Sequence, residues 1–153
     1  MYVVAVVLLM LVFPVASITI EGFASGHASG LLSLTGKWFV FWAVGIRLFV
    51  AGARQVLQPQ FTAKEIFEIQ ESGSFAIVRE LGFANLSMGL LGIFSLFRTG
   101  WIVPAAIVGG LYYGLAGMGH VFRNSKNFKE YVAMVSDLFV FLILAVFVLK
   151  SFL

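Results

Sequence analysis

Cysteine is absent from the 153-residue chain, and charged residues make up only 11% of it. The lack of cysteine excludes a disulfide framework, a thiol nucleophile and a Cys-ligated metal or cluster. A soluble domain carries roughly twice this charged fraction, so there is too little polar surface here to cover a water-soluble fold. The formal net charge of +3 sits in short loops. This charge therefore indicates how the chain is oriented in a membrane rather than an affinity for nucleic acid.

Catalytic signatures are also missing, since the sequence holds no HExxH, GxSxG or Walker pattern. The glycines between Gly109 and Gly119 are interpreted as helix packing, because a phosphate-binding loop would have to follow a strand. His120 is a candidate haem ligand, but the second histidine, His27, falls in a loop assigned to the opposite side of the membrane. Haem would need a non-His axial ligand or another subunit, so the sequence disfavours haem and predicts no metal site.

Apolar sequence is abundant: 61% of the residues are hydrophobic, 17 are Phe, and the mean hydropathy is +1.02. A helix that spans a membrane needs about 20 apolar residues. The pattern predicts an all-α fold, a polytopic transmembrane helical bundle in one domain, 1–153, with one short interfacial amphipathic helix. The expected spans are about 2–20, 37–55, 75–98, 101–122 and 128–151.

The first span is expected to be retained rather than cleaved. A signal peptide would begin with a basic segment, and Met1-Tyr2-Val3 offers none. Pro14 is a candidate for a bend in this helix. The Gly/Ser-rich stretch 21–36 is expected to be a flexible or re-entrant loop, with His27 solvated and inert.

The longest polar stretch, 55–74, is expected to carry a short helix. Pro59 breaks the preceding span, and the capping box Thr62-Ala-Lys-Glu65 places a helix start at Thr62. Apolar residues at 66, 67 and 69 among charged neighbours predict an amphipathic helix on the membrane surface. A solvated connector is the alternative interpretation.

Small residues form a smooth stripe on each of the next two spans, which lets another backbone approach closely. These residues are Gly82, Asn85, Gly89 and Gly92 on the third span, and Ala106, Gly110, Gly114 and Gly117 on the fourth. Because a tight turn at 98–100 joins the two spans, the pattern predicts an antiparallel hairpin in which the two stripes touch.

The distribution of Lys and Arg predicts the orientation in the membrane. One side holds Arg54, Lys64, Arg123, Lys126 and Lys129, and the other holds Lys37, Arg98 and Lys150. The side with more basic residues is expected to be cytoplasmic, which places the N-terminus inside.

Polar groups within apolar segments are the candidates for function, because hydrocarbon cannot solvate them without partners. The candidate ligand- or proton-binding residues are Arg47, Arg79, Glu80, Asn85, Tyr113, His120, Glu130 and Asp137. The predicted topology gathers ionisable groups near the cytoplasmic boundary and places three polar groups deeper in the same half. The groups at the boundary are Arg54, Arg79, Glu80, His120, Arg123 and Glu130, and the deeper ones are Arg47, Asn85 and Asp137. An isolated carboxylate at that depth would take up a proton, so Asp137 is expected within hydrogen-bonding reach of Arg47 or Asn85. His120 is expected near Glu80 at the cytoplasmic rim.

Two interpretations of these groups stay open. They form an ion-paired network that fixes the packing of the bundle, or they line a half-membrane cavity, open to the cytoplasm, that binds a polar head group, a quinone or a proton. For Arg47 there is the further alternative that its side chain snorkels to the lipid headgroups.

Three classes of function fit this pattern. The first is an integral subunit or small-ligand-binding module, quinone- or lipid-linked, with other membrane subunits or further copies of the chain as partners in the bilayer. The second is a transporter or proton pathway through Glu80, His120 and Asp137, although the sequence shows no inverted repeat and no Pro-broken pair of spans. The third is a membrane-embedded enzyme that uses the same residues as acid and base; the lack of a catalytic signature disfavours it.

Three motifs carry a resemblance to a known family. They are Arg79-Glu-Leu-Gly-Phe-Ala-Asn85, Gly114-Leu-Ala-Gly117 with His120, and Asn127-Phe-Lys-Glu130 with Ser136-Asp137. In these motifs, over about residues 60–150, the chain resembles a bacterial family of small integral membrane proteins of unknown function, which implies the bacterial inner membrane. The RELG segment is also similar to DoxX-type four-helix proteins, a likeness that implies a quinone link only by analogy.

Overall fold

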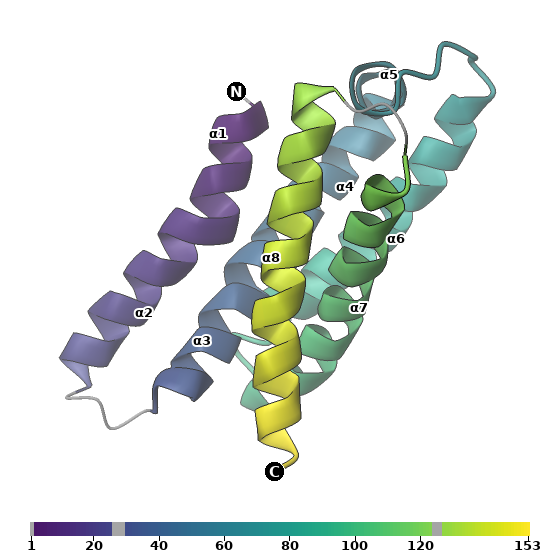
Figure 1. Ribbon diagram of the computed structural model, residues 1–153. Helices are drawn as coiled ribbons and strands as arrows, with labels where there is room; N and C mark the ends of the chain where they lie inside the picture. Colours follow the sequence, from purple (N-terminus) through teal and green to yellow (C-terminus); the bar gives the residue numbers. More distant parts are fainter. Residues whose placement is uncertain (1, 26–29, 124–126) are drawn as a thin grey trace.

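The structure, a computed structural model, describes residues 2–25, 30–123 and 127–153. Its described part is an all-α bundle without strands. Five of its helices are long and apolar enough to cross a membrane, and Figure 1 shows them side by side. The predicted fold class is confirmed.

Each membrane-length helix is identified by its segments. The first consists of α1 (Tyr2–Val7), η1 (Leu8–Val12) and α2 (Phe13–Ala24), and the second of α3 (Leu31–Phe39), η2 (Val40–Arg47) and α4 (Leu48–Leu57). The others are α6 (Ser74–Phe94), η4 (Thr99–Trp101) with α7 (Ile102–Val121), and α8 (Phe128–Ser151). The segments η1 and η2 are π-helical. Such wider turns occur inside longer helices, frequently at functional sites.

The second helix begins earlier than predicted, at Leu31 instead of 37. The expected loop 21–36 is helical on both sides, and an ion pair between Lys37 Nζ and Glu21 Oε1 at 2.7 Å ties the two helices together. Trp38 Nε1 also donates to Glu21, at 2.7 Å. The expectation for His27 lies outside the described residues.

The connector between α4 and α6 contains the expected short helix, but the predicted start at Thr62 is wrong. Helical structure begins at Pro59 in α5 (Pro59–Phe61) and continues through η3 (Thr62–Ile66), without a side-chain cap. Proline is pre-organised for the first position of a helix, which explains the earlier start. Ala63 and Ile66 are buried while Lys64 and Glu65 are exposed, so the segment is amphipathic.

The predicted hairpin contact between the two glycine stripes is wrong. The helix α6 packs mainly on α4, and α7 mainly on α8. A Cβ built on Gly92 would lie 2.5 Å from the backbone nitrogen of Gly45, and one built on Gly117 would lie 2.8 Å from Leu138 Cδ2. The stripes do serve close packing, but each faces a different helix, because a short turn fixes only that neighbours are antiparallel.

The two ends of the bundle differ in character. Figure 1 shows the N-terminus, α5 and the start of α8 at one end and the C-terminus at the other; we call these the N-terminal end and the C-terminal end. Arg54, His120, Arg123 and Glu130 all lie close to the N-terminal end, at the ends of α4, α7 and α8. The predicted gathering of ionisable groups at one end is therefore confirmed.

Candidate functional site

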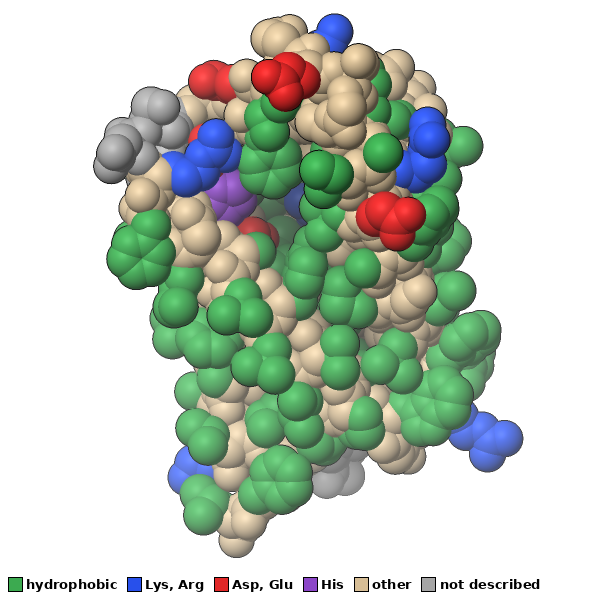
Figure 2. All heavy atoms as spheres, turned by 90° about the vertical axis from the view of Figure 1, so that its right-hand side faces the viewer, with side chains coloured by type: hydrophobic (Ala, Val, Ile, Leu, Met, Phe, Trp, Pro, Cys, Tyr) green, Lys and Arg blue, Asp and Glu red, His purple; other side chains and the backbone are tan. Residues whose placement is uncertain are grey.

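A cavity of about 690 Å³ lies in the N-terminal half of the bundle and is lined by all five long helices and by the α5–η3 connector. Figure 2 shows a hollow there, with a histidine side chain and basic side chains at its edge, above a broad apolar belt. Most of the wall is aliphatic or aromatic. The polar and charged side chains that line it are Tyr2, Arg47, Arg54, Gln55, Thr62, Asn85, Tyr112, Tyr113, His120, Arg123 and Asp137.

Three candidate residues form a polar layer at one depth. Arg47 lies ten residues before the end of α4, Asn85 eleven residues after the start of α6, and Asp137 nine residues after the start of α8. At about 1.5 Å per helical residue each lies roughly 15 Å from the N-terminal end. Helices that run in opposite directions thus bring the three groups to the same level, at a depth of about half the 30 Å hydrocarbon thickness of a typical bilayer.

Arg47 ends the π-helical segment η2 and points into the cavity. Its guanidinium carbon lies 6.0 Å from the centre of the Tyr2 ring. Asp137 acts on it through space, but among the described residues neither side chain forms an ion pair within 4.0 Å. The predicted direct contact of Asp137 with Arg47 is therefore absent, and both groups face the cavity instead.

Asn85 is almost fully buried, at 1% exposure. Its Nδ2 donates to Gln55 Oε1 at 2.7 Å, which links α6 to α4. Its Oδ1 is a buried acceptor without a hydrogen-bond partner in the described structure. Buried polar atoms are normally paired, so this oxygen is an unsatisfied acceptor in a residue that lines the cavity. The predicted contact with Asp137 is absent, since the amide of Asn85 donates to Gln55 and no hydrogen bond joins it to Asp137 in the described structure.

Tyr113 has a structural role. Its ring is 2% exposed, and its hydroxyl donates to the backbone carbonyl of Ala43 in η2. The neighbouring Tyr112 is half-buried and lies at the level of Asn85, with which its hydroxyl interacts.

A second cluster closes the edge of the cavity where α7 passes to α8. His120 Nδ1 lies 2.9 Å from Glu130 Oε1, and Arg123 Nη1 lies 2.9 Å from the same oxygen. The Asn127 side chain caps α8 by accepting from the Glu130 backbone nitrogen at 2.9 Å. Arg123 also donates to the carbonyl of Phe67 at 3.2 Å, so the cluster joins α7, α8 and the connector.

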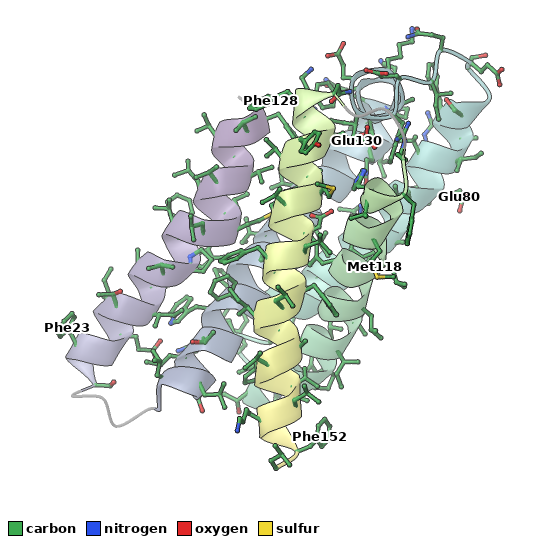
Figure 3. The ribbon with its side chains drawn as sticks, in the orientation of Figure 1. Phe23, Glu80, Met118, Phe128, Glu130 and Phe152 are labelled. Atoms are coloured by element: carbon green, nitrogen blue, oxygen red, sulfur yellow. The ribbon has the colours of Figure 1, made fainter. Side chains whose placement is uncertain are left out.

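The expected pairing of His120 with Glu80 is wrong. Glu80 and Arg79 are exposed on the outer face of α6, and Figure 3 shows Glu80 pointing away from the bundle while Glu130 lies between α8 and α7. Successive residues of α6 are rotated by about 100° about the helix axis. Since Gly82, Asn85 and Gly89 face α4, residue 80 falls on the opposite side of α6 and residue 79 at about a right angle to that face.

The sequence reasoning missed Gln55, Tyr112 and Phe67. Gln55 continues the stripe of Arg47 and Ala51 at a spacing of four residues, so helical periodicity was a sufficient signal for it. Tyr112 adjoins the candidate Tyr113. Phe67 stacks on His120 with ring centres 6.3 Å apart, and nothing in the local sequence marks it.

Fold and site together define a class, a five-helix bundle of membrane-crossing length with one polar layer inside a cavity in its N-terminal half. The chain belongs to a family of unknown function, DUF6790, whose family model matches residues 2–151. The family match thus covers the first span as well as the region that carries the three motifs. No curated protein and no solved structure matches the chain significantly.

Proposed function

We propose that this chain is a multi-pass protein of the bacterial inner membrane that binds a lipid-like ligand, a quinone or a lipid, in the cavity at its N-terminal end. Ligand pockets for small molecules have volumes of about 300–1,000 Å³, apolar walls and a few polar groups that fix orientation. The cavity of about 690 Å³ fits this description.

The observation that carries the proposal is the polar layer. Arg47 and Asp137 face the same space without a direct ion pair, and Asn85 Oδ1 has no partner in the described structure. Ionisable groups at such depth are costly unless something compensates them. A polar head group in the cavity would do so, while the apolar walls would hold its tail.

The proposal includes the orientation of the protein in the membrane. The end that carries Arg54, Lys64, Arg123 and Lys129 is more basic than the other, which supports a cytoplasmic N-terminal end. The head group would then enter from the cytoplasmic leaflet.

The test is the purification of the protein from native membranes in a neutral detergent, followed by extraction and mass spectrometry of bound small molecules. Ala116 lines the cavity, so Ala116→Trp should fill it and remove the co-purifying molecule. Ala84 is exposed on the outer face of α6, and Ala84→Trp is the matched control that should retain it. A bound molecule that survives Ala116→Trp, or no bound molecule at all, contradicts the proposal.

A proton pathway is the second candidate, favoured by the placement of His120 at the mouth and Asp137 at the depth of one cavity. Glu80 is no part of it, since that side chain is outside the bundle. Proton flux in liposomes that Asp137→Asn abolishes would support this candidate over simple ligand binding.

A further inference from the structure

The second helix directs two guanidinium groups into the cavity. Arg47, Ala51 and Arg54 lie on one stripe of the η2–α4 helix, and all three line the cavity. Two positions seven residues apart on one helix face are separated by about 10 Å. The small Ala51 side chain between them leaves a niche whose two ends are positively charged.

Neither guanidinium has an acidic partner in the described structure. The ion pairs present are Lys37–Glu21, Arg123–Glu130, His120–Glu130 and Lys129–Glu65. Arg54 is held instead by an aromatic ring, with its guanidinium carbon 3.5 Å from the centre of Phe61. That contact fixes Arg54 at the mouth of the cavity without neutralising it.

The cavity therefore carries an excess of positive charge. Its charged lining consists of Arg47, Arg54, Arg123 and Asp137. Arg123 is balanced by Glu130, which leaves two guanidiniums against the single carboxylate of Asp137. Arg54 is an exposed residue, whereas Arg47 lies deeper in the cavity, where a charge without a direct partner is unfavourable. A ligand with one negative charge would supply that partner and bring the cavity to neutrality.

We infer that the head group of the ligand is an anion, a phosphate or a carboxylate, which Arg47 binds at the deep end of the niche and Arg54 at the mouth. This inference rests on the proposed function and narrows its ligand. Guanidinium groups bind phosphate and carboxylate through paired, charge-assisted hydrogen bonds. A neutral quinone offers no charge to balance the pair. A hydroxyl beside the anionic group would meet the free acceptor Asn85 Oδ1.

The test measures binding of short-chain probes to the full-length protein in a neutral maltoside detergent. The probes are dodecyl phosphate and decanoate, which separate a phosphate from a carboxylate head group, and decylubiquinone as the neutral amphipath. Dodecyl phosphate or decanoate should bind saturably. Arg47→Gln and Arg54→Gln should each raise the Kd of that probe about tenfold, the equivalent of 1.4 kcal/mol.

Two control variants separate charge from folding. Arg79 is an exposed arginine outside the cavity near the same end, so Arg79→Gln should leave the Kd unchanged. Arg47→Lys retains the positive charge and should lose less affinity than Arg47→Gln. Unchanged affinity in both glutamine variants overturns the inference, and so does the absence of binding by either anionic probe.

The same experiment separates this inference from the proposed function. In one outcome, decylubiquinone binds, Ala116→Trp abolishes its binding, and the arginine variants leave its Kd unchanged. The cavity is then a ligand site, but its ligand is neutral. Should Ala116→Trp change the binding of no probe, the cavity is not a ligand site and both proposals fail.

Discussion

Nδ1 of His120 lies 2.9 Å from Oε1 of Glu130, across the junction between α7 and α8. The carboxylate is 2% exposed, and Arg123 approaches the same oxygen. The pair stands at the edge of the cavity, so it fixes the position of the α7–α8 junction relative to the mouth.

Replacement of Glu130 should destabilise the fold. Glu130→Ala would leave His120 and Arg123 without their carboxylate, and a charge-assisted hydrogen bond contributes roughly 1.5–3 kcal/mol. We expect a loss of about 2 kcal/mol in the free energy of unfolding. The loss falls in the lower part of that range because water can solvate the half-exposed Arg123 in the variant. Denaturant unfolding in mixed micelles measures it. Glu80→Ala, an outer-face carboxylate, is the control, and an equal loss there would contradict the role given to Glu130.

The close approach of α6 to η2 should make Gly92 sensitive to the smallest side chain. A Cβ on Gly92 would lie 2.5 Å from the Gly45 nitrogen, whereas one on Gly119 meets nothing within 4 Å. Gly92→Ala should therefore cost about 1–3 kcal/mol through overpacking. Gly119→Ala should be neutral or stabilise by up to about 1 kcal/mol, as expected for a helical glycine. Thermal unfolding of the two variants gives the comparison, and equal midpoints would refute the packing.

The helix pairing can be tested with engineered disulfides, because the chain has no cysteine of its own. A Cβ on Gly110 would lie 3.4 Å from Leu144 Cβ, close to the spacing of about 3.5–4.5 Å found in disulfides. Gly110→Cys with Leu144→Cys should cross-link on mild oxidation. Gly82→Cys with Gly114→Cys should not, since those glycines face α4 and α8. Efficient cross-linking of the second pair would show that the glycine stripes of α6 and α7 touch and would contradict the observed packing.

Asp137→Asn distinguishes a structural from a ligand-binding role. Because Asp137 forms no direct ion pair within the described structure, the change should shift unfolding by no more than about 0.5–1 kcal/mol. Binding of a ligand that contacts the polar layer should change instead. Unfolding and binding are measured on the same preparation. A large loss of stability with unchanged binding by the folded fraction would assign Asp137 to packing.

The connector should loosen in acid. A hydrogen bond and charge from Lys129 lower the pKa of Glu65 below its ordinary value of 4.5. A carboxyl with a lowered pKa stabilises the folded state above its unfolded pKa, and this contribution is lost as the pH falls through the folded pKa. The tether of η3 to α8 should thus weaken only below about pH 4.5.

A spin label at Ile69→Cys reports this loosening as increased mobility. The label should gain mobility as the pH falls through the acidic range, and high salt should increase it at neutral pH. In a Glu65→Gln background the label should already be mobile at pH 7 and lack this acidic transition. A pH response that Glu65→Gln leaves unchanged would exclude Glu65 as its source.

The local sequence was sufficient to predict the five long helices, since the length and apolar character of each segment decide whether it can cross a membrane. It was also sufficient for the gathering of Arg54, His120, Arg123 and Glu130 at one end, because the number of spans determines which helix ends meet. The expected start of the last span at residue 128 is confirmed, and the Asn127 side chain caps α8 there.

The choice of partners was decided only by tertiary structure. The glycine stripe of α6 was visible in the sequence, but any smooth face can accept any helix of suitable shape, and α4 rather than α7 fills it. In the same way, Glu80 and Glu130 both lie near the N-terminal end, and only the rotation of α6 and α8 about their axes points Glu130 at His120 and Glu80 outward. That rotation is fixed by packing along whole helix faces, so no local pattern around either carboxylate reveals it. The polar layer has the same origin: Arg47, Asn85 and Asp137 were each marked by their depth, but only the packing of the helices brings all three to the wall of one cavity.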